Sequence, residues 1–127
     1  MNLLLDTHLL IWAASGDLPS EAVRYIEDMS NSLYFSPASI WEVVIKSKLG
    51  RKDFSVDPLL LYGGLLDAGY KELAITGNHT LFVTNLPEIH KDPFDRILLA
   101  QSAFERFPLL TSDEVVAQYP GFIIYVN

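Results

Sequence analysis

Leu3-Leu4-Leu5-Asp6-Thr7, close to the start of the chain, is the stretch that indicates the fold most directly. Three consecutive leucines predict a short strand whose two faces are both buried. Thr7 is an acceptable N-cap, and the apolar residues after it predict a helix that continues through Trp12 to Ala14. A buried strand that passes directly into a helix is typical of an α/β fold, and Asp6 lies at the junction.

The same alternation continues along the chain. Further strands are expected over residues 33–35, 73–75, 109–110 and 122–126. Helices are expected over residues 20–29, 36–49, 57–66, 78–86 and 92–104, with a helical turn near Glu114. Ser36-Pro37 and Asp92-Pro93 each combine a capping residue with a proline at the first helical position. We therefore predict a single α/β domain over residues 1–127, with a mainly parallel sheet flanked by helices.

The helix expected to open at Asp57-Pro58 would turn Leu61, Leu65 and Leu66 towards the core. Hydrophobic residues make up 50% of the 127 residues. Two interpretations fit this share, and both can hold: a parallel sheet buried on both faces, or an apolar surface that meets a partner.

Composition also excludes several classes of protein. Cysteine is absent, which excludes a disulfide framework and a thiolate metal site. No apolar run is long enough for a membrane span, and no basic segment precedes the first apolar run as in a signal peptide. We therefore expect a cytoplasmic protein that does not enter a membrane.

The formal net charge of −7 argues against a general nucleic-acid binder, because phosphate contacts require Lys or Arg. It does not exclude a nuclease that uses a metal ion. Four of the nine basic residues fall within one short segment: Lys46, Lys48, Arg51 and Lys52. They are either the solvated end of a helix, where cations are favourable, or a patch that contacts RNA phosphates.

Four carboxylates stand where an apolar run gives way to a helix, or one turn into a helix: Asp6, Glu42, Asp95 and Asp113. In parallel α/β sheets, ligands bind outside the carboxyl ends of the strands, so acids from four distant segments can meet there. Their repulsion is costly unless a cation neutralises it. Carboxylate ligands without thiolates suit a hard cation such as Mg²⁺ or Mn²⁺.

Each acid also has an ordinary structural explanation. Asp6 and Asp113 can cap helices, and Asp95 can favour the helix dipole from the first turn. Glu42 lies beyond the capping turn and is flanked by Trp41 and by Val43, which is a poor place for a merely solvated glutamate.

Neighbouring polar residues allow two roles each. Asp92 caps its helix or contacts a metal-bound water, and Arg96 holds a site carboxylate or touches a substrate phosphate. His8 is expected to be a core residue or a residue that contacts the metal ligands without binding the metal itself. His79 and His90 are expected in loops. Core or interface packing is expected for the tryptophans Trp12 and Trp41, in preference to base stacking.

Four segments that carry these acids resemble the signatures of PIN-domain proteins: Leu4-Leu5-Asp6-Thr7-His8, Ser36-Pro37-Ala38-Ser39-Ile40-Trp41-Glu42, His90-Lys91-Asp92-Pro93-Phe94-Asp95-Arg96 and Leu110-Thr111-Ser112-Asp113. Within that family, the chain is most similar to VapC-type toxins of toxin–antitoxin pairs. The resemblance covers nearly the whole chain. It implies a Rossmann-like sheet of four or five strands, Mg²⁺- or Mn²⁺-dependent endoribonuclease activity, inhibition by a small antitoxin, and a homodimer.

The resemblance also implies roles for single residues. Asp6 and Asp95 match direct metal ligands, and Glu42 and Asp113 complete the set directly or through water. Secondary candidates are Thr7, Asp92, Arg96, Thr111 and Ser112. For the homodimer surface, the expected exposed residues are Trp12, Leu61 and Tyr62.

Two other functions are weighed against this one. A PIN-like module could bind a partner without catalysis, its acids serving structure alone. A phospho-acceptor receiver domain also has acids at strand ends, but it needs a lysine late in the chain, and no Lys or Arg follows Arg106.

Overall fold

The computed structural model describes residues 1–127 and contains one five-stranded sheet. The strands are β1 (Asn2–Leu5), β2 (Ser32–Phe35), β3 (Lys71–Glu72), β4 (Leu109–Thr111) and β5 (Ile123–Tyr125). Their order across the sheet is β3-β2-β1-β4-β5, and every neighbouring pair is parallel. The expected Rossmann-like α/β fold is confirmed.

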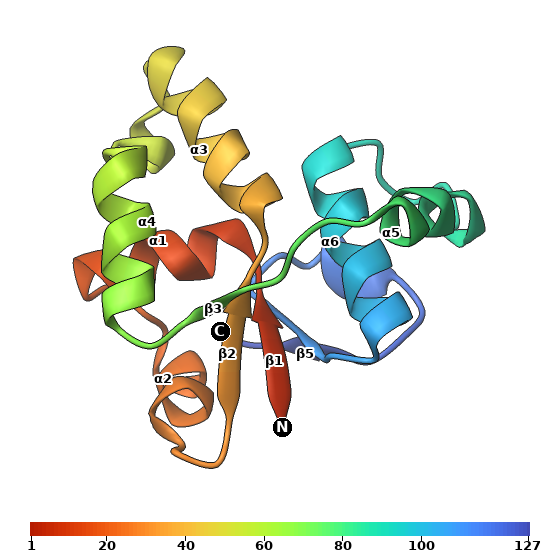
Figure 1. Ribbon diagram of the computed structural model, residues 1–127, viewed down its shortest axis with the longest axis horizontal. Coiled ribbons are helices and arrows are strands. Elements are labelled where there is room, and N and C mark those ends of the chain that lie inside the picture. The colour runs from red at the N-terminus through yellow and green to blue at the C-terminus, as the bar shows by residue number, and fades with distance from the viewer.

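Six α-helices surround the sheet: α1 (Thr7–Ser15), α2 (Ser20–Glu27), α3 (Pro37–Lys48), α4 (Pro58–Asp67), α5 (Gly77–Phe82) and α6 (Pro93–Glu105). Helices α1, α3 and α4 pack together to one side of the strands, and α5 packs on α6 to the other (Figure 1). No helix has both the length and the apolar character needed to cross a membrane.

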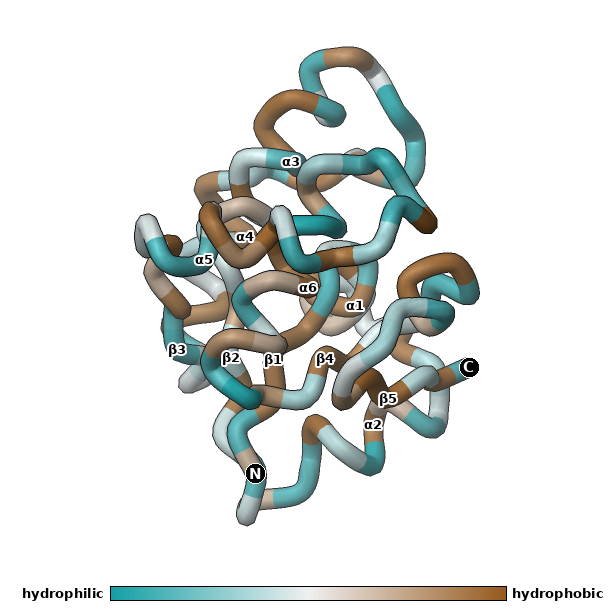
Figure 2. Tube along the Cα trace, turned by 90° about the vertical axis from the view of Figure 1, so that its right-hand side faces the viewer, coloured by the Kyte–Doolittle hydropathy of each residue, from teal (hydrophilic) through white to brown (hydrophobic).

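Both faces of the sheet are buried, as the leucine run in β1 predicts. Leu3 and Leu5 lie in one hydrophobic core with Phe35, whereas Leu4 lies in a second core with Leu98. Alternate side chains of a strand point to opposite faces, so a strand covered on both sides needs consecutive apolar residues. The hydrophobic stretches of the chain include β1 and β4 in the middle of the molecule (Figure 2).

Capping residues begin the helices that carry the site. Asp6, and not Thr7, is the N-cap of α1, and its side chain accepts a hydrogen bond from the Leu9 amide at 3.1 Å. Ser36 caps α3 with Pro37 at the first position, as predicted. Asp92 caps α6, also as predicted, and accepts hydrogen bonds from two amides of the first turn.

The third strand lies two residues before the predicted 73–75. Strand β3 is formed by Lys71 and Glu72, which are exposed at the edge of the sheet. Charged residues are favourable on an edge strand because they discourage pairing with other chains. The apolar residue Leu73 packs instead against the second core, and Ile75 is partly exposed beyond it.

Two predicted helical faces were wrong in part. In α4, Leu61 and Leu65 are buried but Leu66 is 44% exposed, because a helix that buries positions four apart turns the next residue outward. Leu61 is only 2% exposed, so it cannot belong to an exposed dimer surface. Helix α2 ends at Glu27, which leaves Met29 outside it and exposed.

Candidate active site

The four acids converge on one polar pocket of ≈ 220 Å³. Its nine lining residues include no hydrophobic side chain: Asp6, Thr7, His8, Glu42, Lys46, His90, Asp92, Asp95 and Asp113. Asp6 directly follows β1, and Asp113 lies two residues after β4. These two strands are neighbours at the position where the strand order reverses, which is where open α/β sheets place their ligand crevice.

Asp6 is held in place through both of its carboxylate oxygens. Oδ1 accepts the hydrogen bond from the Leu9 amide, and Oδ2 accepts one from the hydroxyl of Thr111 on β4. The residue is 6% exposed, and this burial raises the pKa of the Asp6 carboxyl despite the hydrogen bonds that lower it. Thr7, the next residue, donates a hydrogen bond to the Ser39 hydroxyl at 2.9 Å and so ties α1 to α3.

Glu42 projects into the pocket from α3 and is only 4% exposed. Its Oε2 accepts a hydrogen bond of 2.6 Å from the ammonium group of Lys46, one turn further along the helix. Its Oε1 is inaccessible to solvent and has no hydrogen-bond partner. Burying a carboxylate oxygen without a hydrogen-bond partner costs free energy. A cation bound to this oxygen would remove that cost, and no hydrogen bond would have to be broken first.

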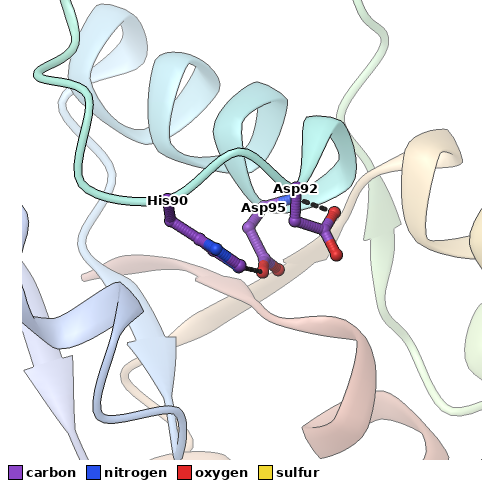
Figure 3. A group of neighbouring side chains, drawn as sticks. All are labelled: His90, Asp92 and Asp95. Atoms are coloured by element: carbon purple, nitrogen blue, oxygen red, sulfur yellow. Dashed lines mark hydrogen bonds and ion pairs between the residues drawn. The ribbon is translucent and has the colours of Figure 1, made fainter.

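Asp92, Asp95 and His90 form a compact group at the start of α6, in which the His90 ring points toward the Asp95 carboxylate and the Asp92 carboxylate lies to one side of this pair (Figure 3). One potential ligand atom from each lies within 4.8 Å of the other two. His90 Nε2 is 2.8 Å from Asp95 Oδ2. The Asp92 Oδ1 atom accepts the two amide hydrogen bonds of the helix start, while its Oδ2 is 3.8 Å from the Lys46 ammonium.

The carboxyl group of Asp95 binds protons unusually tightly. Burial is the main cause that raises its pKa to about 6, and the negative charges of Asp92 and Glu42 add to the effect. His90 acts in the opposite direction through its hydrogen bond. The pocket therefore holds negative charge that the protein alone does not fully neutralise.

Asp113 is the most exposed of the four acids, and its Oδ1 accepts hydrogen bonds from the amides of Val115 and Val116. These bonds stabilise the turn before the short 3-10 helix Val116–Gln118, but the N-cap of that helix is Val115 and not Asp113, which the sequence had allowed. Its own amide donates to the Thr111 hydroxyl at 3.0 Å, so one threonine links Asp6 and Asp113. Ser112, between them, is half-buried, and its amide lies against the Asp6 carboxylate.

Arg96 contacts no carboxylate of the site, so the first of the two roles considered for it is not seen. Its guanidinium donates hydrogen bonds to three backbone carbonyls and to the Tyr119 hydroxyl. These contacts hold the loop before α6, which carries His90, and give Arg96 a structural role beside the site.

The four basic residues between positions 46 and 52 have different surroundings in the structure. Lys46 lines the acidic pocket, whereas Lys48, Arg51 and Lys52 are exposed and do not line it. Arg51 lies 3.4 Å from Asp53, whose other neighbour is His8 at 3.2 Å. His8 therefore stands at the rim of the site and is not a core residue.

Two residues were missed by the sequence reasoning. The contact of His90 with Asp95 gave no signal, because it depends on how the preceding loop folds. The Lys46–Glu42 pair could have been found, since residues four apart lie on one face of a helix. His79 was expected in a loop but is fully buried in α5, where it contacts Glu105 at 2.7 Å.

The donor set fits a hard divalent cation. Five carboxylates and one lysine line the pocket, so its formal charge is −4 with neutral histidines. Oxygen donors of this kind, with one buried oxygen left without a partner, are the ligands that Mg²⁺ and Mn²⁺ prefer.

Comparison with solved structures supports this fold. A chain of the DNA-bound VapBC2 complex from Rickettsia felis superposes with a TM-score of 0.77 at 13% identity, covering 100% of each chain. A DNA-bound VapBC complex from Salmonella typhimurium gives 0.70 at 14% identity, covering 98% of each chain. A toxin-antitoxin complex from Klebsiella pneumoniae superposes with a TM-score of 0.65 at 21% identity, and the match covers 96% of this chain and 95% of that chain.

At these identities the likeness concerns the fold alone. No curated protein sequence matches the chain. Residues 3–121, however, match the PIN domain. The resemblance carried by the four acid-bearing segments is therefore confirmed, and this chain belongs to the PIN-domain family.

Proposed function

We propose that this protein is a divalent-metal-dependent endoribonuclease and the VapC-type toxin of a toxin–antitoxin pair. The observation that carries the proposal is the meeting of Asp6, Glu42, Asp95 and Asp113 in one polar pocket of a PIN domain. The VapBC and toxin-antitoxin complexes that share the fold support the toxin assignment.

Asp6 and Asp95 would hold the metal, with Glu42 and Asp113 completing the set of ligands. A bound Mg²⁺ or Mn²⁺ supplies positive charge next to the scissile phosphate and lowers the pKa of water. The Leu9 amide and the Thr111 hydroxyl fix the orientation of the Asp6 carboxylate, and His90 fixes that of Asp95. Anchored ligands lose little conformational freedom when they bind, which favours a precise position for the phosphate.

Asp92 and the exposed basic residues are proposed to act around this centre. Asp92 lines the pocket, and its Oδ2 atom, which accepts no hydrogen bond from the helix amides, could accept one from a metal-bound water. Lys48, Arg51 and Lys52 would contact RNA phosphates outside the pocket, where the local positive charge offsets the overall charge of −7.

A small antitoxin is the proposed protein partner. An apolar pocket of ≈ 610 Å³ lies among α1, α2 and α4, and eleven of its twelve lining residues are hydrophobic. Such a surface suits an amphipathic segment that buries its apolar side chains. Trp41 and Leu59 are exposed outside this pocket and support a further apolar contact, which we assign to a homodimer in the cytoplasm.

Cleavage of RNA tests the proposed function. Purified protein should cut single-stranded RNA internally in the presence of Mg²⁺ or Mn²⁺ and stop when EDTA is in excess. The same sequence as DNA serves as the matched substrate and should remain intact. Equal loss of RNA with and without EDTA would contradict the metal-dependent mechanism, and no cleavage at any metal concentration would favour a non-catalytic, partner-binding module.

A further inference from the structure

Lys46 is the only lysine or arginine among the nine residues that line the acidic pocket. Its side chain is 19% exposed, whereas Lys48, two residues further along the same helix, is exposed. Lysine side chains mostly keep their ammonium groups in water, so a largely buried lysine inside an acidic pocket requires an explanation.

Acids and aromatic rings hold the Lys46 ammonium in place. It lies 2.6 Å from Glu42 Oε2 and 3.8 Å from Asp92 Oδ2, and thereby joins α3 to the start of α6. The ring centroids of Phe54 and Phe94 are 4.9 and 5.8 Å from it. Cation–π contacts of this kind favour a positive charge at one fixed position.

The ammonium therefore occupies a position where two carboxylates from different helices meet. A divalent cation bound to the same Glu42 oxygen would lie within a few ångströms of it and be repelled. Lys46 does not contact the remaining donors, which include Asp6, Asp95, Asp113 and the unpartnered Oε1 of Glu42, so their oxygen lone pairs can still coordinate a cation.

We propose that Lys46 takes the place of a second divalent cation, so that the pocket binds one metal ion. The inference rests on the proposed function for the metal and deepens it, because it assigns a built-in positive charge to the Glu42–Asp92 side of the site. With one divalent cation the formal charge of the pocket changes from −4 to −2, and Lys46 remains paired with Glu42.

Counting bound Mn²⁺ tests the assignment without any measurement of cleavage. The metal-free full chain is titrated with Mn²⁺, free ion is followed by electron paramagnetic resonance, and the number of ions per chain is obtained. Wild type should bind one ion. Lys46→Met keeps an unbranched stem that can pack on the aromatic rings but removes the charge, and it should bind two.

Three further variants make the result decisive. Lys46→Gln repeats the loss of charge with a side chain that can still donate to Glu42, and it should also bind two ions. Lys46→Arg keeps a cation and should bind one. Lys48→Met makes the same chemical change at an exposed position of α3 and should leave the count at one. Circular dichroism confirms that each variant is folded.

Two Mn²⁺ ions in wild type would overturn the assignment of Lys46 and leave the metal-dependent function intact. One ion in the folded neutral variants would also overturn it. A wild-type chain that binds no Mn²⁺ would contradict both this assignment and the metal-dependent function, so the two failures are distinguishable.

Discussion

Asp95→Asn should make the metal-free protein more stable at neutral pH, although it removes a ligand. In the fold, burial and neighbouring negative charge raise the pKa of the Asp95 carboxyl from 3.8 to about 6. This rise corresponds to about 3 kcal/mol of unfavourable free energy for the ionised form. The side chain is 18% exposed, so solvent screening removes little of this amount. Asparagine keeps the shape of the side chain and retains an oxygen that can accept a hydrogen bond from His90.

The sign of the pH dependence follows from the direction of the shift. Because the folded pKa lies above the unfolded value, the folded state binds the proton more tightly. The stability that this proton contributes is fully present below about pH 4 and is lost as the pH rises to about 6. The advantage of the Asp95→Asn variant should therefore grow over this window and level off above it.

Urea unfolding at a fixed protein concentration, with EDTA, measures the difference at pH 4 and pH 7.5. Glu88→Gln removes one negative charge from an exposed loop and is the matched control, for which little change is expected. Added Mn²⁺ should stabilise wild type by about 2.7 kcal/mol at a hundred times its Kd and leave Asp95→Asn nearly unchanged. An asparagine variant no more stable than wild type at pH 7.5 without metal would refute the reasoning.

Three further predictions concern the support of the site and its partners. Thr111→Val should lower the free energy of unfolding by about 1–3 kcal/mol, because it leaves a buried oxygen of Asp6 without its hydrogen-bond donor. Thr111→Ser keeps the hydroxyl and should retain most of the wild-type stability. Urea unfolding measures both differences. Light scattering should give twice the monomer mass at micromolar concentration, and a monomer there would exclude the proposed homodimer. We also propose that the antitoxin places one Arg or Lys against the acidic pocket, where it offsets part of the formal charge of −4. Replacing that residue should weaken inhibition of cleavage more than it weakens binding, since the apolar contacts carry most of the affinity. Unchanged inhibition at stoichiometric antitoxin and excess Mg²⁺ would mean that the antitoxin acts by steric cover alone.

The fold was predictable because its signals are local. The leucines of β1 form one continuous apolar run, and a sheet covered on both faces requires such a run. Caps followed by proline located the starts of α3 and α6. The edge strand β3 was misplaced because an edge position requires neither apolar residues nor alternation, so its two charged residues gave no strand signal.

The acids of the site were predictable for a related reason. Asp6 and Asp113 stand at strand ends, where the topology of a parallel sheet brings them together. The contacts of these acids were not predictable, because they depend on loop conformation and on side-chain direction. Arg96 is an example: its sequence position next to Asp95 indicated the site, yet it faces the carbonyl groups of the preceding loop.

Cleavage by Asp6→Asn protein is the most direct test of the metal-dependent site. This change keeps the shape of the side chain and removes the negative charge of the carboxylate that lines the pocket directly after β1. With Mg²⁺ or Mn²⁺, wild type and Glu88→Gln should cut end-labelled RNA, whereas folded Asp6→Asn should leave it intact. Cleavage at the wild-type rate by Asp6→Asn protein, purified free of wild type, would contradict the account.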